Sequence, residues 1–375
     1  MFQKIVIIGG GVLGACSSYY LAEAGHEVIV LERRELASGA SGGNSGETSL
    51  LDRGDPWHLE TSLASLKIYE QWSRTHDIEY QVTGGCTVLH DEEQYFAMRE
   101  IARELVPYGV PVEFYVGERM REIEPLINVE RLHSLACCPM EGKINPFYTT
   151  LSFFEEAKKL GVKIHAHTEV TGFEIEDRTI SAVHTDRGDF TGDIVVNAAG
   201  AWASRIGELC GVPVPVLNHR GTAFVTEPVQ PCINTPVVDG DYLIKKLMNS
   251  EKRSICIGAN QCKHGGIVIA QATEVTDLED KEVSVQGLCQ TAKLFTEYFP
   301  SLSDVAVVRA WSAVTPFTKD GLPVFGFSEG LKNLFTVAGF KGAFTTAPVV
   351  GQNVVRALDE GFVWEGGRFS PDRAL

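Results

Sequence analysis

Apolar and polar positions along the first part of the chain alternate in a way that predicts a βαβ unit. Residues 4–8 form a β-branched apolar run, residues 12–24 are typical of a helix, and residues 28–31 form a second apolar run. Gly25 follows the helical segment, where glycine is a common C-terminal cap. Strand, helix and strand in this order indicate parallel strands joined by a crossover helix.

Later segments repeat this mixed pattern and then change. Residues 149–160 predict another amphipathic helix, residues 193–199 and 334–337 predict buried strands, and residues 348–358 predict a final helix. Between residues 213 and 308, prolines and many short β-like runs indicate an antiparallel sheet. The order favours an α/β protein with two interleaved domains.

The glycine-rich turn after the first strand predicts a dinucleotide site. Gly9-Gly10-Gly11-Val12-Leu13-Gly14 gives G-x-G-x-x-G between a strand and a helix. Gly9 permits the tight turn, Gly11 lets a pyrophosphate approach the backbone, and Gly14 lets helix and strand pack closely. The phosphates are expected on the N–H groups of the helix start, where Val12 and Leu13 lie. The alternative is a glycine-rich turn in an unrelated α/β fold.

The residues after the second strand favour FAD as the dinucleotide. Glu32 lies about 18 residues beyond Gly14, where a carboxylate can accept ribose hydroxyls. Arg33 and its neighbour Arg34 are also compatible with NADP. A loop rich in glycine and serine follows at residues 38–46, and its N–H groups can hold a further phosphate and a ribityl chain. The cofactor residues that we predict in this loop are Ser41, Asn44, Ser45 and Gly46.

Five segments in this order resemble the glycine oxidase, D-amino acid oxidase and sarcosine oxidase family of flavoproteins. They are the glycine motif with Glu32-Arg33, residues 41–46, residues 195–202, residues 320–326 and Ala338-Gly339-Phe340. The resemblance implies an α/β fold with a split Rossmann-like FAD-binding domain and a second domain containing a mostly antiparallel β-sheet. We predict the FAD-binding domain in residues 1–83, 143–212 and 310–375, and the substrate-binding domain in residues 84–142 and 213–309.

The resemblance also implies cofactor contacts that the residues alone do not indicate. Val170 is expected to touch the adenine through its backbone, and Ala199 and Gly200 to pass close to the phosphates and ribose. The segment that is expected to pass the isoalloxazine contains Gly339, Phe340, Lys341 and Gly342. Covalent flavins in this family use a Cys or His, and this segment has no Cys, so non-covalent FAD is expected.

The resemblance further implies oxidation of a small amino or imino acid by hydride transfer to flavin N5. A substrate carboxylate needs a positive or hydrogen-bonding partner. Two positions that are Arg in glycine oxidases correspond here to Thr315, a neutral donor, and Lys341, a point charge. Tyr242, from the β-rich segment, is a third candidate. The alternatives are a solvated lysine for Lys341 and an aromatic core residue for Tyr242.

The departure from a simple Arg clamp favours one subunit of a larger dehydrogenase. Relatives of that kind pass electrons to partner subunits that carry FMN, FAD or iron–sulfur centres. A stand-alone amino-acid oxidase and a 2-hydroxy-acid dehydrogenase are the enzymatic alternatives. A flavin-bearing electron-transfer or assembly subunit without its own substrate is the alternative from another class.

Composition disfavours some classes of partner and favours one cellular compartment. The net charge of −16 disfavours nucleic acid and anionic lipid as partners. No run reaches the roughly 18 apolar residues of a membrane span. Nine scattered cysteines without a C-x-x-C spacing predict mostly buried thiols, and neither a metal site nor an iron–sulfur cluster. We therefore expect a soluble, cytoplasmic protein.

Overall fold

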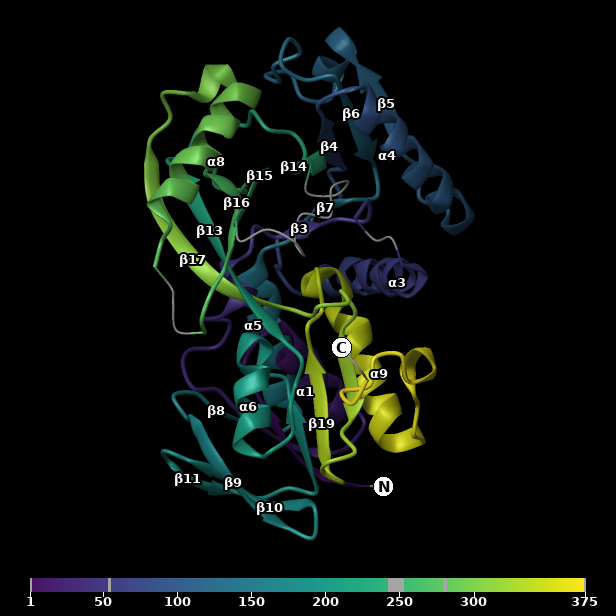
Figure 1. Ribbon diagram of the computed structural model, residues 1–375, viewed down its shortest axis with the longest axis vertical. Coiled ribbons are helices and arrows are strands. Elements are labelled where there is room, and N and C mark those ends of the chain that lie inside the picture. Colours follow the sequence, from purple (N-terminus) through teal and green to yellow (C-terminus); the bar gives the residue numbers. More distant parts are fainter. Residues whose placement is uncertain (1, 53–54, 242–252, 279–281, 374–375) are drawn as a thin grey trace. The chain divides into compact units, whose positions relative to one another are not determined.

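The computed structural model describes residues 2–52, 55–241, 253–278 and 282–373 (Figure 1). They form two compact units, each built from separate stretches of chain. Unit 1 comprises Met1–Gly42, Pro146–His219 and Val314–Leu375, and unit 2 comprises Gly43–Asn145 and Arg220–Ala313. The units differ from the predicted domains chiefly at residues 43–83, which lie in unit 2.

A six-stranded sheet forms the centre of unit 1, in the order β18-β19-β12-β1-β2-β8. The strands from β19 to β8 are parallel, and β18 runs antiparallel to β19. β1 and β2 are almost entirely buried, which is typical of parallel strands. The strands are β1 (Lys4–Ile8), β2 (Glu27–Leu31), β8 (Lys163–His165), β12 (Ile194–Asn197), β18 (Val324–Phe327) and β19 (Leu334–Ala338).

Helices and a small second sheet complete unit 1. Helix α1 (Val12–Glu23) packs against α5 (Pro146–Lys159) and α9 (Ala343–Glu360) (Figure 1). A Cβ atom on Gly351 of α9 would lie 2.8 Å from the backbone carbon of Cys16, so a glycine is needed for this close approach. Unit 1 also contains α6 (Ala203–Leu209) and an antiparallel sheet of β9 (Val170–Glu176), β10 (Thr179–Thr185) and β11 (Gly188–Phe190).

An eight-stranded sheet dominates unit 2, in the order β17-β13-β16-β15-β14-β4-β6-β5. The pairs β15–β16, β14–β15, β4–β6 and β5–β6 are antiparallel, whereas β4 and β14 run parallel. The strands are β4 (Gly85–Leu89), β5 (Glu113–Val116), β6 (Ser134–Cys138), β13 (Leu217–Thr226), β14 (Val237–Asp239), β15 (Arg253–Gln261), β16 (Ile267–Val275) and β17 (Val307–Phe317). The boundaries between the units fall within β13 and β17.

Helix α8 (Val285–Tyr298) packs on β15 and β16 and contributes to the core of unit 2. Its buried Phe295 and Tyr298 join a cluster with Val237 and Ile257. Unit 2 also contains α3 (Pro56–Trp72), α4 (Glu92–Leu105) and the paired strands β3 (Glu47–Thr48) and β7 (Gly142–Lys143). In the part of the chain that the structure describes, no helix is long and apolar enough to span a membrane.

Two expectations about secondary structure in the C-terminal part of the chain were wrong. Helix α8 lies within residues 213–308, for which the sequence predicts only antiparallel strands. Its apolar residues belong to a helical stripe that packs on a sheet, a tertiary arrangement that short β-like runs conceal. Helix α9 begins at Ala343 rather than at residue 348, and Pro348 lies inside the helix.

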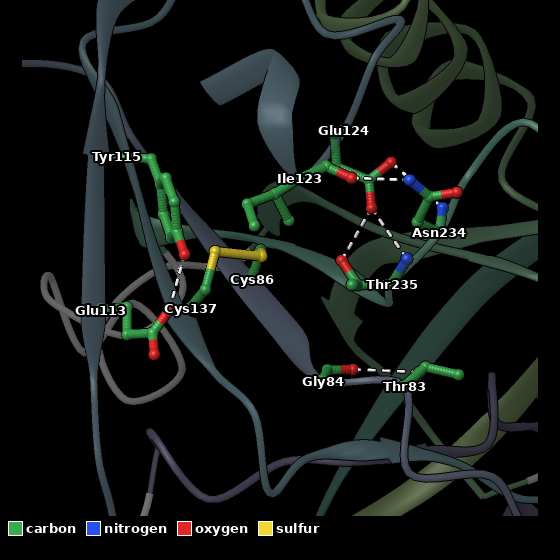
Figure 2. Close-up of a disulfide and its surroundings, with 10 residues drawn as sticks. All are labelled: Thr83, Gly84, Cys86, Glu113, Tyr115, Ile123, Glu124, Cys137, Asn234 and Thr235. Atoms are coloured by element: carbon green, nitrogen blue, oxygen red, sulfur yellow. Dashed lines mark hydrogen bonds between the residues drawn. A yellow bond between two sulfur atoms is a disulfide. The ribbon is translucent and has the colours of Figure 1, made fainter. Parts of the chain in front are cut away.

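One pair of cysteines departs from the expectation of buried thiols. Cys86 and Cys137 form a disulfide between the neighbouring strands β4 and β6, where they are register partners with Cα atoms 4.2 Å apart (Figure 2). The two are 51 residues apart in sequence, so their spacing did not indicate the pairing. Cys16, Cys138 and Cys210 are buried thiols, and burial raises the pKa of each.

Candidate functional site

Four neighbouring parallel strands of unit 1 end at one edge of the sheet. β1 leads to Gly9, β2 to Glu32, β12 to Ala198 and β19 to Gly339. Because these strands lie in the order β19-β12-β1-β2, their carboxyl ends bring the four segments together. Open α/β sheets bind their ligands at this edge, so it is the candidate site.

The turn between β1 and α1 can be built only with glycine. Gly9 has a φ angle of 123°, and a Cβ atom there would lie 2.4 Å from the carbonyl oxygen of Ala198. A Cβ atom on Gly14 would lie 2.1 Å from the carbonyl oxygen of Gly9. Both contacts are with backbone atoms, which cannot move aside. The roles predicted for these glycines, a tight turn and close packing of helix on strand, agree with this geometry.

The start of α1 is oriented by the predicted cofactor loop. The backbone N–H of Val12 donates to Oγ of Ser41 over 2.9 Å. A Cβ atom on Gly11 would meet only the side chain of Ser41, whose Oγ would lie 2.9 Å away, so no backbone of another segment lies within 4 Å of this position. Backbone N–H groups in the first turn of a helix, here including Leu13, have no partner within the helix and attract anions.

Glu32 joins the end of β2 to the glycine turn. Its Oε2 accepts the N–H of Gly10 at 2.7 Å, and its Oε1 accepts the N–H of Arg34 at 2.8 Å. Each carboxylate oxygen has two lone pairs, so both can still accept a ligand hydroxyl. The carboxylate is therefore held in a fixed position at the sheet edge while part of its accepting capacity is retained.

Arg33 follows Glu32 directly, and its side chain lies near Glu169, the residue before Val170. The Arg33 guanidinium stacks over the ring of Trp202 at 4.0 Å and lies 3.9 Å from the carboxylate of Glu169. Val170 follows Glu169 as the first residue of β9 and is buried. The side chain of Arg33 is thus used to hold the segment after β12, a contact that the sequence analysis did not anticipate.

The segment after β12 lies against the glycine turn that follows β1. The N–H of Ala198 donates to the carbonyl of Ile8 at 2.9 Å, which continues the sheet by one residue. Asn197 fixes the next residues, since its Nδ2 donates to the carbonyl of Ala203 and its Oδ1 accepts the N–H of Ala199. Gly200 has a φ angle of 58°, a left-handed conformation that favours glycine.

The turn between β19 and α9 holds the predicted substrate residue. Gly339 and Gly342 have φ angles of 71° and 59°, and Gly342 is the N-cap of α9. Phe340 is buried, and Lys341 is half-buried between the two glycines. Thr315 lies on β17, also in unit 1. The third candidate, Tyr242, lies outside the described residues.

The predicted cofactor loop is divided between the units. Its residues 40–43 form the one-turn helix α2 (Ala40–Gly43) rather than a loop. Ser41 belongs to unit 1, whereas Asn44, Ser45 and Gly46 belong to unit 2. Asn44 Oδ1 accepts the N–H of Gly46 at 2.8 Å, and the carbonyl of Ser45 accepts from Asn260 at 3.1 Å.

Two glutamates of unit 2, the half-buried Glu47 and the buried Glu141, were not predicted from the sequence. Oε1 of Glu141 accepts the N–H of Leu51 at 2.8 Å and also that of Leu50. Burial, with a smaller effect from the nearby charge of Asp52, raises the pKa of Glu141 to about 7, although the hydrogen bonds from Leu50 and Leu51 act in the opposite direction. Burial likewise raises the pKa of Glu47 to about 7. Glu47 follows Gly46 directly, but Glu141 had no signal in sequence, since it stands alone between turn residues.

We expect Glu141→Gln to remove a pH-dependent loss of stability. The folded pKa of about 7 exceeds the ordinary value of 4.5, so the folded state favours the protonated carboxyl. The wild-type free energy of unfolding should therefore fall relative to the variant as pH rises from 4.5 to 7, by about 3 kcal/mol in all. Urea unfolding at pH 4 and pH 8 measures this difference. The exposed Glu118→Gln is the control, and parallel pH profiles for wild type and Glu141→Gln would contradict the prediction.

Comparison with known proteins gives a consistent set of relatives. Residues 4–357 match the model of a family described as FAD dependent oxidoreductase (DAO). The chain is 25% identical to the glycine oxidase of Geobacillus kaustophilus, over 92% of this chain and 90% of the relative. It is 26% identical to sarcosine oxidase subunit beta of Arthrobacter sp, over 96% and 90%. The crystal structure of L-proline dehydrogenase from P. horikoshii matches with a TM-score of 0.88 at 28% identity, covering 99% of this chain and 97% of that one.

Proposed function

We propose, on the premise that this chain belongs to the FAD-dependent oxidoreductase family, that it oxidises the C–N bond of a small amino or imino acid. The observation that carries the proposal is the edge of four parallel strands in unit 1, with its glycine turns and Glu32. The glycine oxidase, sarcosine oxidase subunit and L-proline dehydrogenase are all named for amino or imino acids, which supports this substrate class.

The residues at this edge fit FAD. Side chains at Gly9 or Gly14 would collide with backbone, whereas a Cβ atom at Gly11 would meet only the side chain of Ser41. The N–H groups of Gly10 and Val12 already donate to Glu32 and Ser41, so the pyrophosphate would use the remaining N–H groups of the first turn of α1, such as that of Leu13. We assign the pyrophosphate to the start of α1 and the adenosine ribose to Glu32. The other residues that we assign to non-covalent FAD are Val12, Leu13, Arg33, Ser41, Asn44, Ser45, Gly46, Val170, Ala199, Gly200, Gly339, Phe340, Lys341 and Gly342.

FAD, when bound, would accept a hydride from the substrate carbon. The protein must then hold the substrate in one orientation, and it can do so by binding the anionic carboxylate of the substrate. We assign that carboxylate to Lys341, which lies on the glycine-bounded turn before α9. Thr315 is proposed as a neutral hydrogen-bond donor to the same group. Tyr242 stays a candidate for a second donor.

We further propose that the chain is a dehydrogenase subunit whose partners carry FMN, FAD or an iron–sulfur centre. Its similarity to a protein named as a subunit of sarcosine oxidase supports this. Its similarity to glycine oxidase favours a stand-alone oxidase as the alternative. The proposed compartment is the cytoplasm, supported by the buried thiols of Cys16 and Cys210. The Cys86–Cys137 disulfide argues against it.

Anaerobic reduction by a substrate panel tests the proposed function. Purified protein should be yellow, release FAD on acid precipitation, and lose its flavin absorbance when an amino or imino acid is added without oxygen. A dehydrogenase subunit should then turn over with an artificial dye acceptor and form little hydrogen peroxide in air. Rapid peroxide formation would instead identify a stand-alone oxidase.

Other outcomes decide against the proposal. Tightly bound NADP without flavin would overturn the cofactor assignment. Reduction by 2-hydroxy acids alone would change the substrate class. If no amino, imino or hydroxy acid reduces the flavin, alone or with a co-purified partner, the chain is an electron-transfer or assembly subunit.

A further inference from the structure

A second cluster of ionisable residues lies in unit 2, at the ends of two parallel strands. β4 and β14 are neighbours and run parallel, so their carboxyl ends lie at the same edge of the sheet. His90 directly follows β4, and Asp239 is the last residue of β14, with Asp241 two residues beyond. Nitrogen and oxygen atoms of these three side chains all lie within 4.8 Å of one another.

The geometry of this cluster is compact and specific. Nε2 of His90 lies 2.9 Å from Oδ1 of Asp239. The phenol of Tyr298, from α8, donates to Oδ2 of Asp239 at 2.8 Å and lies 3.2 Å from the same Nε2 atom. Gln94, from the first turn of α4, donates its amide to Oδ1 of Asp241. One imidazole, two carboxylates and one phenol therefore converge from separate elements of unit 2.

Burial makes the negative charge in this cluster costly. Asp239 is 3% exposed, Tyr298 is fully buried, and the His90 side chain is 16% exposed. Asp239 and the half-buried Asp241 lie close together. Two neighbouring carboxylates in such surroundings repel each other, and a divalent cation bound by both would offset this repulsion.

We propose that His90, Asp239 and Asp241 bind a divalent transition-metal ion of the Zn²⁺ class. Imidazole nitrogen together with carboxylate oxygen is a ligand set that suits Zn²⁺, whereas Mg²⁺ prefers oxygen ligands alone. The Oη atom of Tyr298 or a water completes four-coordination. The ion replaces the Nε2 proton of His90 and joins the β4–α4 turn, the end of β14 and helix α8. The site is independent of the proposed redox function.

This site contains no cysteine, which explains why the cysteine spacing predicted no metal. His90 and Asp239 are 149 residues apart, and only the parallel pairing of β4 with β14 brings them together. Nothing in the local sequence around either residue resembles a metal motif. The sequence predicted no metal site because this site depends on tertiary structure.

Zinc titration of the full-length, untagged protein tests the proposal. The protein is stripped with EDTA, dialysed and titrated calorimetrically with ZnCl₂, and we expect one equivalent bound per chain. His90→Gln and Asp241→Asn each remove one ligand atom with little change of size. Loss of a group that merely supports a ligand lowers affinity about 10–100-fold, so we expect about a 100-fold loss or more here.

The matched control is His184→Gln. His184 and Asp189 also form a pair, at 2.9 Å, but they lie on an exposed hairpin and belong to no group of three such ligands in the described chain. This variant should bind Zn²⁺ as the wild type does. The rise of the thermal midpoint on adding Zn²⁺ to EDTA-treated protein is a second readout, and it should vanish in His90→Gln. Because it is a difference within one variant, it separates metal binding from altered folding.

Three results would overturn the proposal. Wild-type protein that binds well below one equivalent of Zn²⁺ has no such site. Equal Zn²⁺ affinity in wild type and His90→Gln would place the metal elsewhere. Full displacement of Zn²⁺ by an equal concentration of MgCl₂ would contradict the transition-metal class. In the first two cases the cluster is a hydrogen-bonded network that fastens α8 to the sheet.

Discussion

Glu32→Ala protein is expected to emerge from purification mainly as apoprotein that added FAD restores. The wild-type carboxylate holds the N–H groups of Gly10 and Arg34, at 2.7 and 2.8 Å, and is the group that we assign to the adenosine ribose. A hydrogen bond to a charged group contributes roughly 1.5–3 kcal/mol. Its loss corresponds to about tenfold to over a hundredfold weaker FAD binding. Flavin absorbance per protein before and after dialysis, and titration of the apoprotein, measure the effect.

Glu35→Ala is the matched control, since Glu35 is exposed and its carboxylate pairs with His167 at 2.8 Å. It should retain FAD as the wild type does. Glu32→Gln should be intermediate, because its amide keeps one accepting oxygen but presents an NH₂ group where a second N–H donates. If Glu32→Ala retains all its FAD through dialysis, the carboxylate serves only to fasten the glycine turn to β2.

The unit of β1, the glycine turn, α1 and β2 could be predicted because each of these elements depends on residues that are close together in sequence. The sequence predicts a strand at residues 4–8, and β1 is Lys4–Ile8. The predicted strand at residues 28–31 corresponds to β2, Glu27–Leu31. A short apolar strand, a glycine turn and a helix each depend on neighbouring residues, so pattern and structure coincide. The match to the family model and to the L-proline dehydrogenase structure confirmed the α/β class and the FAD-dependent family.

What could not be predicted depends on contacts between distant segments. Arg33 was predicted at the cofactor, but its stacking on Trp202 depends on β12 lying beside β1. Glu141 is buried against the backbone of residues 50 and 51, some 90 residues away in sequence. The disulfide and the His90–Asp239 pair have the same origin, since strand pairing determines them. Residue type alone carries no information about such neighbours.

The Lys341→Met variant is expected to need much more substrate for half-maximal flavin reduction. Lys341 is the cationic residue on the turn between β19 and α9, the turn that we propose to lie beside the isoalloxazine. Thr315, at the other position that is Arg in glycine oxidases, has no charge to offer. An ammonium–carboxylate contact contributes roughly 1.5–3 kcal/mol, or about tenfold to over a hundredfold in affinity.

The limiting rate of reduction should change little, because this contact acts on bound substrate and transition state alike. Anaerobic stopped-flow measurements over a range of substrate concentrations give both quantities. Lys341→Arg keeps the charge and should preserve most of the affinity, whereas the exposed Lys319→Met should behave as wild type. An unchanged half-saturation in Lys341→Met, with reduction intact, removes Lys341 from the substrate site. The carboxylate would then have to be held by Thr315 or by Tyr242, because these were the other candidates.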